Sequence, residues 1–170
     1  MNTALLIGNL CSLLGTGADS LSSTRKTPQG MLWMQSLGQL IYGIGTFLLG
    51  GYSGVVQNVV SILRNLVAIR GIHNRIIEWT LVALGVVFGI LFNNLGFVGL
   101  LPVVGNLQYT LIIFRFRDNE WVMKISFAGM IASYAFFNFA IYNFVGFALN
   151  LVVLATTAIV LIKEKKAAHT

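Results

Sequence analysis

The stretch from Tyr42 to Asn58, YGIGTFLLGGYSGVVQN, decides the fold because a related stretch, YAFFNFAIYNFVGFALN, follows ninety-two places later. Tyr134 and Asn150 stand in the second stretch where Tyr42 and Asn58 stand in the first, and a Phe and a Gly recur in register between them. Each stretch predicts an apolar helix, a sharp turn and a second apolar helix that buries an Asn near its start. The sequence therefore predicts a duplicated helical unit.

The composition predicts that most of the chain lies in lipid. Hydrophobic residues make up 56% of the 170 residues and charged residues only 9%, and the mean hydropathy is +0.82. A chain of this length can supply about seven segments of the roughly 20 residues that cross a bilayer. The net charge of +6 does not predict nucleic-acid binding, because the Lys and Arg residues stand at the ends of apolar runs and form no basic face.

Seven apolar segments are separated by polar or glycine-containing loops, and the stretch 15–30, with Asp19, is predicted to be the first of these loops. A second match, Gly8-Asn9-Leu10 with Gly105-Asn106-Leu107, extends the repeat to the first helix of each unit. We therefore expect an all-α membrane protein with two parallel three-helix repeats joined by an inverting linker helix. The predicted spans are 1–14, 31–49, 52–70, 78–92, 98–114, 121–142 and 144–162; the predicted units are 1–70 (first repeat), 71–96 (linker helix) and 97–170 (second repeat with a short cytoplasmic tail).

The basic residues predict the orientation. All eleven Lys and Arg residues lie near the loops after the first, third, fifth and seventh predicted spans, and the other loops have none. The positive-inside rule then places the N-terminus outside and the C-terminus in the cytoplasm. Trp33, Trp79 and Trp121 stand near the predicted cytoplasmic helix ends, where interfacial tryptophans anchor membrane helices.

Polar side chains within the spans are the candidate substrate-binding residues. Such groups avoid lipid, so they either line an aqueous path or join helices through hydrogen bonds. The repeat places Asn58 and Asn150 symmetrically, which favours the path for these two. Arg64 has two interpretations, a side chain that snorkels to the cytoplasmic surface or a contact to a substrate or gate. The full candidate set is Asn58, Asn150, Gln39, Tyr42, Tyr134, Asn9, Asn106 and Arg64.

Several kinds of chemistry lack their usual residues. No Asp or Glu falls inside a predicted span, which removes the usual carboxylate for proton or sodium coupling. The sequence has no glycine-rich phosphate loop, no metal-ligand spacing of His, Cys and carboxylates, and no Ser–His pairing within the membrane. We therefore expect neither an enzyme nor a metal or cofactor site.

The architecture resembles that of the SWEET and PQ-loop superfamily, and the local sequence is similar to the YgjV-like bacterial inner-membrane proteins. The residues that carry the resemblance are 48–54 (LLGGYSG), 63–65 (LRN), 99–103 (GLLPV) and the turn 141–143 (IYN). It implies a bacterial inner-membrane protein that transports a small solute or is built on that scaffold. In SWEET transporters an Asn on the third helix of each unit lines the central pocket, and Asn58 and Asn150 stand at the matching positions.

Two functions remain open from the sequence. The first is facilitative transport of a small polar solute of the sugar, nucleoside or vitamin class, by two units that rock around Asn58 and Asn150. The alternative is a non-transporting receptor or partner subunit on the same scaffold. A polar cavity between the units would favour transport, and a tightly packed interior would favour the alternative. A homo-oligomer is compatible with both.

Overall fold

The computed structural model describes residues 3–116, 118–140 and 144–167, and the regular secondary structure in this part of the chain is all helical. The predicted all-α class is confirmed, whereas the turn 141–143 and Arg117 lie outside the described residues. Its seven α-helices and one 3-10 helix are α1 (Thr3–Ser23), α2 (Pro28–Leu48), α3 (Tyr52–Ile69), α4 (Arg75–Leu91), η1 (Val98–Leu100), α5 (Leu101–Phe116), α6 (Glu120–Ala140) and α7 (Phe144–Ala167).

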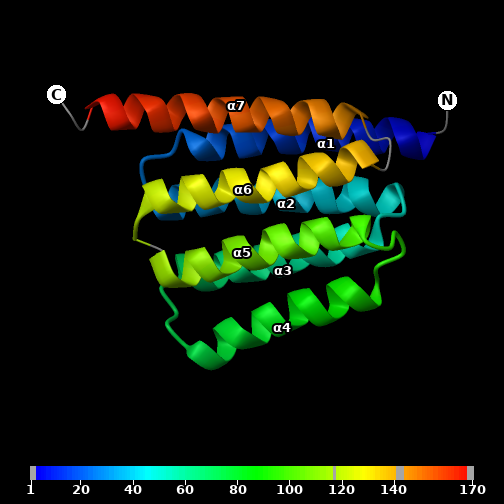
Figure 1. The fold of residues 1–170 in the computed structure, drawn as a ribbon, viewed down its shortest axis with the longest axis horizontal. Helices are drawn as coiled ribbons and strands as arrows, with labels where there is room; N and C mark the ends of the chain where they lie inside the picture. Colours follow the sequence, from blue (N-terminus) through cyan, green and yellow to red (C-terminus); the bar gives the residue numbers. More distant parts are fainter. Residues whose placement is uncertain (1–2, 117, 141–143, 168–170) are drawn as a thin grey trace.

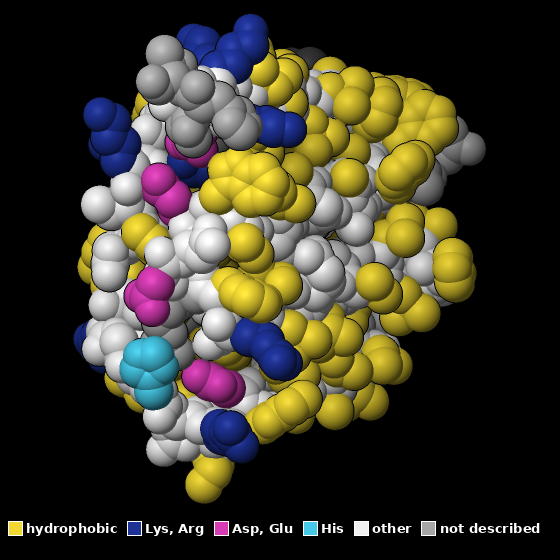
Figure 2. Space-filling model, turned by 60° about the vertical axis from the view of Figure 1, so that its left-hand side comes forward, with side chains coloured by type: hydrophobic (Ala, Val, Ile, Leu, Met, Phe, Trp, Pro, Cys, Tyr) yellow, Lys and Arg dark blue, Asp and Glu magenta, His cyan; other side chains and the backbone are white. Residues whose placement is uncertain are grey.

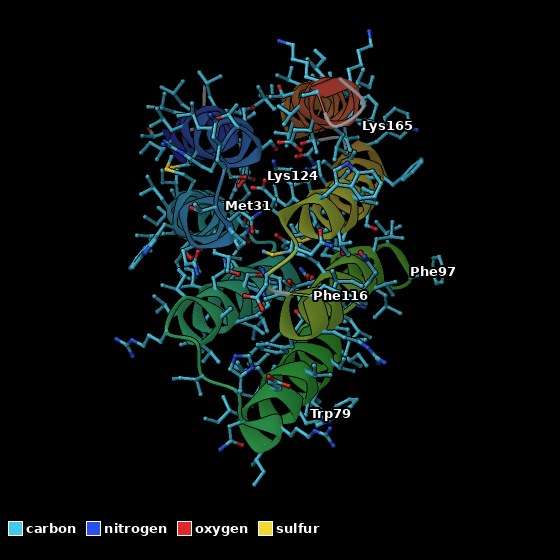
Figure 3. The ribbon with its side chains drawn as sticks, turned by 90° about the vertical axis from the view of Figure 1, so that its left-hand side faces the viewer. Met31, Trp79, Phe97, Phe116, Lys124 and Lys165 are labelled. Atoms are coloured by element: carbon cyan, nitrogen blue, oxygen red, sulfur yellow. The ribbon has the colours of Figure 1, made fainter. Side chains whose placement is uncertain are left out.

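Six of the helices form a ring. Helices α1, α2 and α3 make one layer and α7, α6 and α5 make the other, and the layers meet where α1 packs on α7 and α3 packs on α5 (Figures 1 and 3). Helix α4 lies outside the ring, against α3 and α5. Helix α1 begins at one end of the ring and α7 ends at the other (Figure 1).

Charge distinguishes the two ends. We call the end where α1 stops and α2 starts the basic end, because Arg25, Lys26, Arg70, Arg75 and Arg115 gather there. Figure 2 shows charged side chains along this end and a largely hydrophobic surface beside it. Of the described residues, none at the opposite end, where α2 turns into α3, is Lys or Arg. We call this second end the neutral end.

Local sequence explains where the helices begin and turn. The side chain of Thr27 accepts a hydrogen bond from the Gly30 amide over 3.2 Å and Pro28 is the first residue of α2, an arrangement that favours a helix start. Between α2 and α3 the chain turns at the predicted Gly50-Gly51 pair, where Gly50 has a φ of +75°. Side chains with a Cβ rarely adopt this backbone conformation.

The prediction that the first span ends at Leu14 is wrong, because α1 continues to Ser23. Its hydroxyl groups do not stop the helix, since Thr16 Oγ1 donates to the Ser12 carbonyl oxygen over 2.7 Å and so bonds within its own helix. Asp19 therefore lies inside α1, beside the midpoint of α2: a Cβ added to Gly38 would sit 2.8 Å from Asp19 Oδ1. The prediction that Asp19 stands in a loop is therefore wrong.

Helix α4 packs through its small residues. Gly85 and Gly89 are buried, and the Gly85 carbonyl oxygen accepts a hydrogen bond from Gln57 Nε2 of α3 over 2.8 Å. A Cβ on Gly89 would clash with the Gln57 amide and lie 2.8 Å from Val103 Cγ2 of α5. Close backbone approach of this kind is typical of helix packing in membranes.

Three helical segments of the described chain are long and apolar enough to cross a membrane by themselves: Val98–Phe116, Glu120–Phe139 and Phe144–Ala167. The other helices are either more polar or shorter. Helices α1, α2 and α3 carry many of the buried polar side chains, and α4 has 17 residues. Large apolar side chains nevertheless point outward from α1 and α2 as well, among them Leu10 and Ile44, each more than half exposed.

The contact between α1 and α2 predicts that alanine substitutions at two glycines change the stability of the protein differently. A Cβ on Gly45 would lie 2.9 Å from Cys11 Cβ and 3.1 Å from the Gly8 carbonyl oxygen, whereas a Cβ on Gly17 would meet nothing within 4 Å. We expect Gly45→Ala to destabilise the protein by about 1–3 kcal/mol, as overpacking does, and Gly17→Ala to leave the stability unchanged or slightly raised. Thermal unfolding of the purified variants in the same detergent measures both. Equal melting temperatures for the two variants would contradict this packing.

Candidate functional site

The ring encloses a cavity between its two layers. The centres of water molecules can reach about 80 Å³ of it, and since about 10–15 Å³ of such volume holds one water, there is room for several waters or for a small solute. Its lining comes from α1, α2, α3, α6 and α7 and includes the polar side chains of Asp19, Gln39, Tyr42, Asn58, Tyr134 and Asn150. These groups lie among apolar ones such as Met130, Ile131 and Phe137, which is the usual balance of a ligand pocket.

Asn58 and Asn150, which the predicted repeat pairs with each other, line this same cavity. They come from α3 and α7, on opposite layers of the ring, and their exposed fractions are only 3% and 5%. Asn58 has room beside it because α2 carries Gly43 there, whose added Cβ would lie 3.7 Å from Asn58 Cβ. The Nδ2 atom of Asn150 has no hydrogen-bond partner and is free to bind a solute.

Gln39, Tyr42 and Tyr134 complete the predicted part of the lining. The Gln39 Oε1 atom and the Tyr134 hydroxyl are both buried without a hydrogen-bond partner. Tyr42 differs, because its hydroxyl shares a hydrogen bond of 2.8 Å with Thr16 Oγ1. The ring of Tyr42 packs on Gly15, where an added Cβ would lie 3.0 Å from it. The Thr16 bond therefore holds Tyr42 at the wall and leaves Gln39 and Tyr134 as the groups that need a partner.

Asp19 is the cavity residue that sequence reasoning missed. Its side chain is 1% exposed and neither carboxylate oxygen has a hydrogen-bond partner. The signal that would have found it is the spacing of Ser12, Thr16, Asp19 and Ser23 in the sequence. Steps of four, three and four residues place these side chains on one helix face, which indicates a helix with a polar inner stripe rather than a loop.

Arg64 and Asn106 do not line the cavity; they join α3 to α5. Arg64 is 1% exposed, so the interpretation that it snorkels to the surface is wrong. Its Nη1 atom donates to Asn106 Oδ1 over 2.6 Å and to Thr110 Oγ1 over 3.0 Å, and its guanidinium lies 4.8 Å from the centre of the Tyr109 ring. Asn106 also accepts from Ser61 Oγ over 2.8 Å. For these residues the structure favours the joining of helices over an aqueous path.

Asn9, the remaining predicted site residue, stands apart from both groups. It is half-buried in α1 and is absent from the lining of the cavity. The structure thus brings five of the eight predicted residues into one cavity, Asn58, Asn150, Gln39, Tyr42 and Tyr134, and adds Asp19 to them.

The cavity is asymmetric along the ring axis. Its lining reaches the neutral end through Leu49 and Gly51 of the α2–α3 turn and Gly146 of α7. Towards the basic end an apolar cluster fills the ring. Met31 and Met123, which occupy the same position in the two predicted repeats, are both 0% exposed in this cluster, and Figure 3 shows Met31 between the two layers.

A third buried ionisable residue lies at the basic end. Lys124 of α6 is 0% exposed and forms an ion pair with Glu164 of α7, with Glu120 at 3.7 Å. Both carboxylates are about one-third exposed, so this pair joins two neighbouring helices at the rim. Unlike Asp19, Lys124 is neutralised by protein side chains.

The described residues offer no cluster of three or more His, Cys, Asp or Glu side chains that could hold a metal ion. In the cavity, hydrogen-bonding amides, phenols and one carboxylate are the available groups. This set can bind and orient a small molecule.

Comparison with known proteins gives one result. No curated protein and no solved structure matches the chain. A family model described as "Bacterial inner membrane protein", the Imp-YgjV family, matches residues 6–168. Nearly the whole described chain is covered, and the apolar outer surface and the long apolar helices agree with a membrane location. The protein therefore belongs to the Imp-YgjV family of bacterial inner-membrane proteins.

Proposed function

We propose that the protein is a facilitative transporter that carries a small polar solute through the central cavity. The observation that carries this proposal is a set of five buried polar atoms without a hydrogen-bond partner on four cavity residues. They are the two carboxylate oxygens of Asp19, Gln39 Oε1, the Tyr134 hydroxyl and Asn150 Nδ2. Helix joining does not account for these atoms, because they bond to no other helix.

The energetic cost of these atoms supports a binding role. A buried polar group without a partner costs about 1–3 kcal/mol, and most such groups in folded proteins are paired. Several of them around one cavity are favourable only when water or a solute supplies the missing bonds. A tightly packed receptor or partner subunit would not require that cavity.

The asymmetric ring supports alternating access. The described form has its cavity directed to the neutral end and its apolar cluster closed at the basic end. Met31 of one layer and Met123 of the other both belong to this apolar cluster, so the layers can separate there without breaking an ion pair between these residues. The Lys124–Glu164 pair lies within one layer and survives when the layers rock.

The duplicated sequence supplies the symmetry that rocking requires. In this proposal α1–α3 and α5–α7 are parallel repeats, all seven α-helices cross the membrane, and α4 is the inverting linker, as the resemblance to the SWEET and PQ-loop superfamily implies. The convergence of Asn58 and Asn150 on one cavity supports a binding site on the axis between the repeats.

This topology predicts which loops are accessible from outside. In a Cys11→Ser background, we expect a membrane-impermeant maleimide to label Asn94→Cys, at the neutral end, in intact spheroplasts. His73→Cys, in the loop at the basic end, should react only after permeabilisation, because basic loops stay in the cytoplasm. Both positions are exposed in the structure. Labelling of His73→Cys in intact spheroplasts would reverse the orientation.

Transport predicts saturable uptake into proteoliposomes. Purified protein is reconstituted and tested with labelled sugars, nucleosides and vitamins, and the initial rate is measured below saturation. We expect Asn58→Ala to lower this rate about 2- to 12-fold, since one hydrogen bond contributes roughly 0.5–1.5 kcal/mol.

The matched control is Gln29→Ala, which also removes an amide side chain, at an exposed position outside the cavity, and should leave uptake unchanged. Absence of uptake with every solute class, or equal rates for Asn58→Ala and the unmodified protein, would count against transport.

A further inference from the structure

Asp19 presents a charge problem that the proposed transport of a neutral solute does not solve. Of the described residues that line the cavity, Asp19 alone carries a carboxylate. The side chain is 1% exposed, and both oxygens lack a hydrogen-bond partner. A buried ionised carboxylate is stable only with a cation, hydrogen bonds or a proton to compensate it. The compensating group has to come from outside the protein fold.

The two buried cations of the described chain do not fill this role, and Lys124 of α6 is already paired with Glu164. Arg64 of α3 is bonded to Asn65, Asn106 and Thr110, and it is not among the residues that line the cavity. The titratable side chains that share the cavity lining with Asp19 include the phenols of Tyr42 of α2 and Tyr134 of α6. None of these supplies a positive charge.

We infer that the cavity binds a small organic ammonium group, with the Asp19 carboxylate as its counter-ion. This inference rests on the proposed function and names the solute class. An ammonium group brings both the positive charge and the N–H donors that Asp19 lacks. The unpartnered Oε1 of Gln39 is a second acceptor on the same lining.

The rest of the lining fits an organic cation better than a metal ion. Hard metal cations take six or more oxygen ligands, several of them from carboxylates or water, and the described residues offer no group of three candidate ligands. The lining instead combines one carboxylate with the aromatic side chains of Tyr42, Tyr134 and Phe137. Aromatic faces attract organic cations, and the apolar groups between them favour a carbon skeleton.

The volume limits the size of the solute. About 80 Å³ open to the centres of water molecules corresponds to a handful of waters at about 10–15 Å³ each. A solute of several heavy atoms fits this space. Asn58 and Asn150 remain available for a hydroxyl or carbonyl group at the other end of such a molecule.

Ethanolamine and ethylene glycol test the charge requirement as a matched pair, because they differ only in one ammonium group against one hydroxyl. Binding is measured by calorimetry and by the melting temperature of the full chain in nanodiscs at constant ionic strength. We expect ethanolamine to bind at least tenfold more tightly than ethylene glycol, and Asp19→Asn to remove that preference. Asp118→Asn, the same change on an exposed turn, should keep it.

A second measurement uses the unmodified protein and does not depend on how well the variant folds. Dicyclohexylcarbodiimide modifies buried carboxyl groups, and the modified residue is identified by mass spectrometry. We expect ethanolamine, and not ethylene glycol, to slow the modification of Asp19 at least threefold. Tetramethylammonium, which has a charge but no N–H donor, should protect less than ethanolamine.

Other outcomes separate this inference from transport itself. Equal affinity for the two probes, or protection by sodium or potassium chloride as strong as that by ethanolamine, would overturn the ammonium site. Uptake of a neutral solute that persists in Asp19→Asn would overturn it too, and would leave transport standing. Asp19-dependent binding of ethanolamine without any uptake would sustain the site and reject transport.

Discussion

Hydrocarbon offers no hydrogen bonds, and this constraint governs where each side chain of the protein lies. Leucine, isoleucine and phenylalanine cover the outer surface of the ring, while the hydroxyl, amide and carboxylate groups of α1, α2, α3 and α7 turn inward. Some of the inward groups meet across a helix contact, as Ser23 and Thr157 do over 2.7 Å where α1 meets α7. Of the eight buried polar atoms of the described chain that have no hydrogen-bond partner, five lie on residues that line the cavity. Among the inward polar groups, the presence or absence of a hydrogen-bond partner thus separates those that join helices from those available to a ligand.

The two buried cations and the buried carboxylate illustrate this division. Arg64 is bonded to neutral side chains of α3 and α5, and Lys124 is paired with Glu164 at the basic end, so both contribute to contacts between helices. Asp19 has no such contact. Since the three residues are almost equally buried, burial does not distinguish them. Their partners do, and they identify Asp19 as the group whose bonds remain to be made.

Sequence patterns were sufficient for the all-helical class, for the turn at Gly50-Gly51 and for five residues of the cavity, because hydrophobic periodicity and glycine placement are local signals. The predicted repeat added one long-range relation, because it pairs Asn58 with Asn150 and both residues line the cavity. The length of α1 was not predicted, because a stretch with several Ser and Thr residues has the composition of a loop. In α1 these hydroxyl groups bond to carbonyl oxygens of their own helix instead. The role of Arg64 was equally inaccessible, since it depends on partners from α5 that are more than 40 positions away in the sequence.

The unpartnered carboxylate connects the stability of the fold with its selectivity. The ionised form of such a group costs several kcal/mol to desolvate unless water, a proton or a cation compensates it. A cation that enters regains the Coulomb attraction and hydrogen bonds that the protein leaves unmade, whereas a neutral molecule of the same shape regains only part of them. The free energy that distinguishes the two solutes is therefore already present before binding. This difference arises because binding of a cation pairs a buried charge that has no partner otherwise. It requires no movement of the helices.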